Sequence, residues 1–226
     1  MMSQVKLIFE KQWLHAFSLV LLIAGMVWVA GYNGVRGGQL WGITTPVWIW
    51  LAVAIAIAHQ IYVWLCWRTQ LHASLLTRAL GNLGFPLYAV GFSIFGISRV
   101  VVVFWVAMSN QGTWAVNAVV LKIMAIILLV PALYLFYSVG CYFGYRRAFG
   151  IDHFDSSYRS KPFERRGIFR FTRNGMYTFG FFLLWVPAFW WASLAALSIA
   201  LFNHLYVWVH YLATERPDMK RIYGET

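Results

Sequence analysis

The chain has 226 residues, of which 61% are hydrophobic, 19% aromatic and only 11% charged. Soluble domains carry about 25% charged residues, so this composition excludes an ordinary soluble domain and indicates a protein of the lipid bilayer. The formal net charge is +11. Because no basic and aromatic RNA-binding motif accompanies it, the charge favours an anionic membrane surface, and we expect no nucleic-acid partner.

Four apolar runs come first along the chain, and each is long enough to cross the bilayer, which takes roughly 20 residues. They cover residues 13–32, 47–67, 84–108 and 118–145. The first run is longer than the apolar core of a signal peptide, about 7–15 residues, so we expect it to be retained. The fourth contains Pro131, which membrane helices tolerate when neighbouring helices satisfy the freed carbonyl.

The fifth apolar region, residues 176–214, has about twice the length of one crossing. It lies between two basic segments, the C-terminal tail and residues 146–173; the latter contains Arg146, Arg147, Arg159, Lys161, Arg165, Arg166, Arg170 and Arg173. Short basic loops stay on the cytoplasmic side, so an even number of crossings must join the two. The region is therefore predicted to be a helical hairpin that turns near residues 187–193.

These runs predict an all-α, polytopic transmembrane bundle of about six spans with a C-terminal helical hairpin. Both termini are expected in the cytoplasm, at the inner membrane if the source is bacterial. Residues 1–226 form a single membrane domain: residues 1–145 are its four-span N-terminal part, and residues 146–226 are the candidate functional part. Two polar clusters of residues 146–226, one with Arg173 and Asn174 and the other with Glu215, are expected to converge at one membrane face.

Few residues carry recognisable chemistry outside this region. Cys66 and Cys141 lack zinc-binding spacing, and we expect no metal site. No phosphate-binding glycine loop, dinucleotide-binding motif or serine nucleophile elbow is present. Arg99 and Lys122 stand inside apolar runs, where a charge usually faces the bundle interior or reaches an interface. Arg99 has no acidic partner in the apolar runs.

The stretch Gly167-Ile-Phe-Arg-Phe-Thr-Arg-Asn-Gly-Met-Tyr-Thr-Phe-Gly180 resembles a signature of integral-membrane methyltransferases, G-x-Y-x-x-x-R-[HN]-P-x-Y-x-G. Isoprenylcysteine carboxyl methyltransferases and phospholipid N-methyltransferases share it. Further along the chain these families carry a Glu-Glu pair and a short helix, which Glu215-Arg216-Pro217 and the residues to Gly224 resemble. The resemblance covers about residues 140–224. Gly175 replaces the usual proline, and Arg216 replaces the second glutamate.

The resemblance implies S-adenosylmethionine as cofactor. Its charged ends require a carboxylate and a cation, for which Glu215 and Arg173 are the candidates. Asn174 can donate and accept hydrogen bonds, Tyr177 offers a ring and a hydroxyl, and Gly180 would allow close approach.

The acceptor is expected to be a membrane lipid, by N-methylation of a phosphatidylethanolamine-type headgroup. Arg165, Arg166 and Arg170 are the candidates for binding its phosphate, and His210 and Glu164 are the candidate catalytic bases. One alternative is carboxyl methylation of a prenylated cysteine. Another is a non-enzymatic membrane scaffold or lipid-binding protein, and sterol-reductase-like relatives would instead bind a nicotinamide cofactor.

Overall fold

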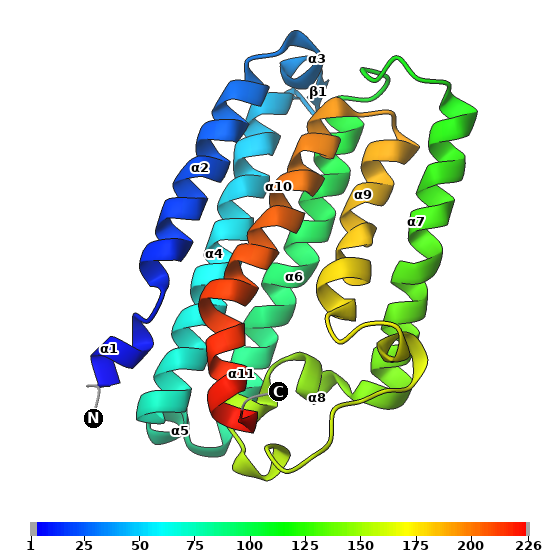
Figure 1. Ribbon diagram of the computed structural model, residues 1–226. Helices are drawn as coiled ribbons and strands as arrows, with labels where there is room; N and C mark the ends of the chain where they lie inside the picture. Colours follow the sequence, from blue (N-terminus) through cyan, green and yellow to red (C-terminus); the bar gives the residue numbers. More distant parts are fainter. Residues whose placement is uncertain (1–3, 225–226) are drawn as a thin grey trace.

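The computed structural model describes residues 4–224, which fold as a bundle of long helices (Figure 1). The helices are α1 (Gln4–Ile8), α2 (Gln12–Ala30), α3 (Asn33–Arg36), α4 (Thr45–Ala73), α5 (Leu75–Leu80), α6 (Gly84–Ser109), α7 (Ala118–Ser138), α8 (Tyr145–Ala148), α9 (Phe181–Trp190), α10 (Leu194–His210) and α11 (Arg216–Tyr223). Single turns of π-helix are η2 (Val139–Phe143), η6 (Met176–Gly180) and η7 (Tyr211–Glu215). Short 3₁₀ turns are η1 (Gly81–Leu83), η3 (Ile151–His153), η4 (Ser156–Tyr158) and η5 (Gly167–Arg170), and the two-residue strands β1 (Gln39–Leu40) and β2 (Ile43–Thr44) pair antiparallel.

The predicted all-α transmembrane bundle is confirmed. Five helical segments of the described chain are long and apolar enough to cross a membrane: Gln4–Ala30, Thr45–Ala73, Leu75–Ser109, Ala118–Phe143 and Leu194–Tyr223. The sixth, Met176–Trp190, is a shorter apolar helix. It forms the first arm of the predicted C-terminal hairpin, α10 forms the second, and the chain turns between Trp190 and Leu194.

Asn110, at the end of α6, holds the hairpin turn in place. Its side-chain oxygen accepts hydrogen bonds from Ser193 Oγ at 3.0 Å and from the backbone N–H of Ala195 at 2.9 Å. Its amide nitrogen donates to the carbonyls of Gly34 and Gly37 near α3. The buried side-chain amide of Asn110 thus forms hydrogen bonds with backbone groups of two separate loops. An apolar side chain at this position would leave those groups unpaired.

Small residues line the centre of the bundle, where α4 and α10 pack against each other. Ala52 and Ala56 of α4 and Ala196 and Ala200 of α10 are almost completely buried in one core cluster. Small side chains let membrane helices approach closely and gain packing energy. These positions let α10 lie against α4, and α10 also packs against α2, α6 and α9.

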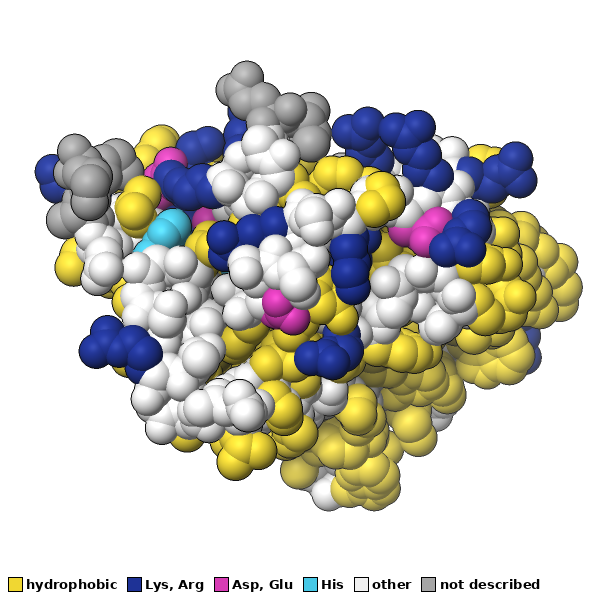
Figure 2. Space-filling view, turned by 90° about the horizontal axis from the view of Figure 1, so that it is seen from below, with side chains coloured by type: hydrophobic (Ala, Val, Ile, Leu, Met, Phe, Trp, Pro, Cys, Tyr) yellow, Lys and Arg dark blue, Asp and Glu magenta, His cyan; other side chains and the backbone are white. Residues whose placement is uncertain are grey.

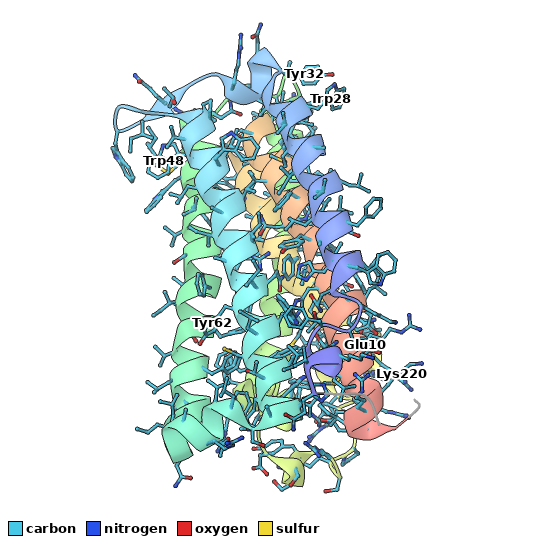
Figure 3. The ribbon with its side chains drawn as sticks, turned by 90° about the vertical axis from the view of Figure 1, so that its left-hand side faces the viewer. Glu10, Trp28, Tyr32, Trp48, Tyr62 and Lys220 are labelled. Carbon is cyan, nitrogen blue, oxygen red and sulfur yellow. The ribbon has the colours of Figure 1, made fainter. Side chains whose placement is uncertain are left out.

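The two ends of the bundle differ in chemistry. At one end Figure 3 shows Trp28, Tyr32 and Trp48; Trp28 and Tyr32 are exposed, as aromatic residues at a membrane interface are, whereas Trp48 is buried in the core. At the other end lie Glu10 and Lys220 (Figure 3). Of the 18 Lys and Arg residues, all but Arg36, Arg99 and Lys122 belong to segments at this second end, which also holds both termini (Figure 1). We call it the basic end, and Figure 2 views it directly.

Candidate active site

Within residues 4–224 the π-helical turns are η2, η6 and η7, and each joins an apolar helix to the loops or the short helix at the basic end. A π turn inserts an extra residue into a helix and is frequent at functional sites. Tyr177 belongs to η6, and Glu215 belongs to η7. The two halves of the methyltransferase-like signature therefore both occupy irregular helix ends near the basic end.

The start of the signature is fixed against α7. Gly167 has a φ of +58°, and a Cβ atom there would lie 2.5 Å from the hydroxyl of Ser138. That hydroxyl accepts a hydrogen bond from the backbone N–H of Ile168 at 3.1 Å. Ile168 and Phe169 are buried in a cluster with Leu135. This anchor places the polar residues that follow at the edge of the bundle.

Arg173 and Asn174 lie just before η6. Arg173 is exposed, and Asn174 is half-buried. The carbonyl of Asn174 accepts from the backbone N–H groups of Tyr177 and Thr178, both at 3.1 Å, and so starts the helix. The backbone N–H of Asn174 donates to Thr172 Oγ1 at 3.1 Å, but among residues 4–224 neither the Arg173 side chain nor the Asn174 side chain forms a hydrogen bond or an ion pair. Both side chains therefore keep their full hydrogen-bonding capacity for a ligand.

Tyr177 connects the first half of the signature to α10. Its ring centroid lies 5.9 Å from that of Trp208 and 5.5 Å from that of Tyr211. Gly180, one turn later, faces α7, where an added Cβ would lie 2.9 Å from Leu135 Cδ2. The close approach predicted at Gly180 is thus made by a protein side chain of the neighbouring helix.

Glu215 and His210 supply polar atoms without partners in the described chain. The Oε2 atom of Glu215 is buried and accepts no hydrogen bond, and neither ring nitrogen of His210 has a hydrogen-bond partner. Glu215 lies within electrostatic range of Asp152, His153 and Asp218. The His210 ring is 5.9 Å from that of Trp67. Since buried polar groups in proteins are almost always paired, these orphaned atoms mark a place where a ligand or water completes the structure.

The structure brings the two halves of the signature together through aromatic rings. Tyr211, which contacts Tyr177, lies one turn before Glu215. Within the described residues no direct polar contact links Arg173 or Asn174 to Glu215. The contact between the two halves is made by Tyr177 with Trp208 of α10 and Tyr211 of η7, and the convergence of Arg173 and Asn174 with Glu215 stays a prediction.

Glu164, a candidate base, is engaged by its neighbours. Its carboxylate accepts two hydrogen bonds from the Arg166 guanidinium, both at 2.9 Å, and two more from the backbone N–H groups of Arg165 and Arg166. The hydrogen bond from the Arg166 side chain, with these contacts, lowers the pKa of Glu164 to about 2. Such a carboxylate is a weak base at neutral pH, and its evident role is to hold the loop.

The three arginines proposed to bind lipid lie together. Arg165, Arg166 and Arg170 line one hollow of about 400 Å³ with Tyr134, Tyr142 and Gly167. A neighbouring hollow of about 470 Å³ shares Tyr142 and contains Glu164. Tyr134 is 41% exposed on α7, and Phe171 is 73% exposed beside the arginines. The arginine hollow therefore opens next to apolar surface of the kind that faces lipid.

Sequence reasoning missed a buried ionic network at the basic end. Arg68, at 0% exposure, donates to Asp218 at 2.8 Å and to the carbonyls of Ala213 and Thr214. His153 stacks on Trp67 and lies between two carboxylates, 3.2 Å from Asp152 and 3.6 Å from Asp218. Tyr223 donates to Asp152 at 2.8 Å. In the sequence, only the position of Arg68 near the end of an apolar run indicated that it could be paired. These contacts hold α11 and the loop that contains Asp152 and His153 beside Glu215.

The sequence model of the phospholipid methyltransferase family matches residues 120–226. The match begins in α7 and includes both halves of the signature, the arginine hollow and Glu215. It confirms the predicted resemblance to membrane methyltransferases. Comparison with curated proteins and with solved structures finds no significant match.

Proposed function

We propose that the chain is an S-adenosylmethionine-dependent methyltransferase that acts on a membrane lipid, with the amine of a phosphatidylethanolamine-type headgroup as acceptor. The observation that carries this proposal is the coincidence of the family match with the residues gathered at the basic end. The same segment contains two predicted parts of an active site: polar residues suited to a cofactor and an arginine hollow suited to a phosphate.

The residues present fit the cofactor. The buried, unpartnered Oε2 of Glu215 can accept hydrogen bonds from an ammonium group or from ribose hydroxyls. The rings of Tyr177 and Tyr211 offer an aromatic surface to a purine. Arg173 and Asn174 carry free polar ends beside them, and Gly180 keeps η6 close to α7. We infer that these residues hold the cofactor, which would supply an electrophilic methyl group.

An ethanolamine nitrogen gives up one proton for every methyl group it accepts, so the site needs a route for that proton. Of the two candidate bases, His210 suits this role better, because both of its ring nitrogens lack partners whereas Glu164 is held by Arg166. A neutral imidazole nitrogen can accept a proton directly or through one water. His210 is therefore our candidate base.

The lipid would reach the site from the side of the bilayer. Arg165, Arg166 and Arg170 present guanidinium groups that bind a phosphate through charge-assisted hydrogen bonds. The exposed rings of Tyr134 and Phe171 are suited to the membrane interface. By the positive-inside rule the basic end, with both termini, faces the cytoplasm, at the inner membrane if the source is bacterial.

The test is methyl transfer by the purified full chain from radiolabelled S-adenosylmethionine. Vesicles containing phosphatidylethanolamine and a detergent-solubilised prenylcysteine would be offered separately. We expect label in the ethanolamine lipid. Base-labile methyl ester on the prenylcysteine, with no label in the lipid, would replace this acceptor by the carboxyl alternative, and no transfer to either would favour a non-enzymatic lipid-binding protein.

A further inference from the structure

The N-terminal segment, residues 4–15, contacts η7, the π turn that carries Glu215. α2 begins at Gln12, which is 9% exposed, and α2 packs against both α10 and η7. Gln12 Nε2 donates to Thr214 Oγ1 at 3.2 Å, and Thr214 directly precedes Glu215. Because the family model matches residues 120–226, this contact joins the matched part of the chain to a segment far outside the match.

The Gln12 side chain is itself oriented by buried hydrogen bonds. Its Oε1 atom can only accept, so His15 Nδ1 is the donor of the 3.0 Å bond between them. In the neutral imidazole, His15 Nε2 then accepts from the Tyr206 hydroxyl at 2.8 Å. These bonds turn the donor end of the Gln12 amide toward η7. The His15 ring also lies 6.2 Å, centroid to centroid, from the ring of His210, our candidate base.

The η7 turn needs partners from outside its own helix. Pro217, at the start of α11, has no backbone N–H, so the carbonyl of Ala213 loses the donor that a regular α-helix supplies four residues later. Arg68 Nη2 donates to this carbonyl at 3.2 Å and to that of Thr214 at 3.1 Å. Through Nη1 the same guanidinium donates to the Leu7 carbonyl of α1. Arg68 and the N-terminal segment therefore hold η7 together.

Glu215 follows directly on the two residues that are held. Its Oε2 atom is buried and has no partner in the described chain. A π turn contains one residue more than an α turn, so relaxation of η7 to a regular helix would rotate Glu215 by about 100°. The hydrogen bonds from Gln12 and Arg68 oppose this rotation, and they thereby determine where the carboxyl group of Glu215 points.

We propose that Gln12 and Arg68 are positioning residues of the cofactor site, which act on binding of the methyl donor through Glu215 and do not contact the donor themselves. This assignment rests on the proposed function and extends its site to the N-terminal segment and α4. It also gives the fully buried charge of Arg68 a task beyond its pairing with Asp218.

A double-mutant cycle tests the proposal by calorimetry with S-adenosylhomocysteine on the detergent-purified full chain. The proteins are the native chain, Gln12→Met, Glu215→Gln and the variant with both changes. Gln12→Met keeps the size of the side chain and removes its hydrogen bond to Thr214. We expect it to weaken binding about three- to tenfold, as the loss of one hydrogen bond does. In the Glu215→Gln background the same change should have no further effect, because residues that act through one another are not additive.

Arg68→Lys is the second variant. A lysine keeps the charge opposite Asp218, but its single nitrogen cannot replace the guanidinium at both the carboxylate and the carbonyls of η7. It should weaken binding at least as much as Gln12→Met, and again only where Glu215 is present. Thr45→Val is the control, since the buried Thr45 hydroxyl donates to the Gly37 carbonyl at 2.9 Å at the opposite end of the bundle. It should lower the melting temperature and leave the affinity unchanged.

Losses of affinity that add up in the double variant would overturn the proposal, as would unchanged affinity in both Gln12→Met and Arg68→Lys or an equal loss in Thr45→Val. Where one of the two variants does not fold, the other decides. Where neither folds, Thr214→Val takes their place in the cycle, because it removes only the hydroxyl that accepts from Gln12.

Two further results separate this proposal from the proposed function. If the native chain binds S-adenosylhomocysteine and Glu215→Gln binds it equally well, nothing can act through Glu215, and the positioning role fails while the cofactor site stands on its other residues. If the native chain does not bind S-adenosylhomocysteine, the proposed function fails and the positioning role fails with it.

Discussion

Glu215 is the single side chain on which the proposed cofactor site depends most, because its Oε2 is buried without a partner. In Glu215→Gln the shape is kept and the side chain can no longer ionise. We expect affinity for S-adenosylhomocysteine to fall about tenfold or more, with no loss of thermal stability, because Oε2 accepts no hydrogen bond within the described chain. Calorimetry measures the affinity and a melting curve measures the thermal stability, with Asp155→Asn in the exposed loop as the control variant. Equal affinity in Glu215→Gln and the native chain would argue against this role.

His153 makes stability depend on pH. Burial lowers the pKa of His153, but its contacts with Asp152 and Asp218 outweigh burial and raise that pKa to about 9 from an ordinary 6.5. Because the folded-state pKa is raised, this contribution to stability is full below pH 6.5 and is lost as the pH rises through about 9. The melting temperature should therefore fall across this interval.

The check is a series of melting curves between pH 6 and pH 9.5 for the native chain and for His153→Asn. The variant should be less stable at pH 6 and should show a shallower decline. Parallel curves for the two proteins would mean that another group causes the pH dependence.

The η5 turn is the element that carries the signature residues into place, and it depends on Gly167. Gly167→Ala adds strain at a φ of +58° and a clash with Ser138, and we expect a loss of about 1–3 kcal/mol. Gly112→Ala is the matched control, since its φ is +73° but nothing lies within 4 Å of the added Cβ. Denaturation measures the loss of stability, and proteolysis measures the exposure of residues 155–173. Both effects should be larger in Gly167→Ala than in Gly112→Ala if the contact of η5 with α7 stabilises the fold.

The C-terminal hairpin predicts which loops share a membrane face. Single cysteines would replace the exposed residues Ser160, Lys220 and Asn117 in a chain with Cys66 and Cys141 changed to alanine. An impermeant maleimide should label positions 160 and 220 from one side of sealed vesicles and position 117 from the other. Labelling of positions 160 and 220 from opposite sides would be incompatible with two crossings between them.

For the molecule as a whole, the sequence was sufficient for the helices and insufficient for their contacts. For most helix ends, the boundaries of the apolar runs lie within a few residues of those in the structure. The charges around residues 176–214 predicted the hairpin. Local composition determines such features. The pairs Arg68 with Asp218 and Arg99 with Asn203 join residues more than 100 positions apart. They depend on the rotation of each helix about its own axis, which near-uniform apolar sequence does not specify.

For the candidate site, too, the sequence indicated which residues are neighbours along the chain but not their contacts in the folded protein. Arg165, Arg166 and Arg170 share a hollow because they are neighbours on one loop, and their clustering could be read from spacing alone. At Gly180 an added Cβ would meet Leu135 of α7, a contact that the sequence does not reveal. Glu164 was considered as a base, but its bonds to Arg166 follow from the conformation of the loop. Packing and loop geometry are properties of the folded chain.

The central claim is that residues 167–180 and 208–223 form one cofactor site in a membrane methyltransferase. Photolabelling of the purified native chain with radiolabelled S-adenosylmethionine, followed by peptide mapping, tests it most directly. The account predicts label in peptides from both segments and its loss when excess S-adenosylhomocysteine competes. Label confined to other peptides, or label that the competitor does not displace, would contradict the account.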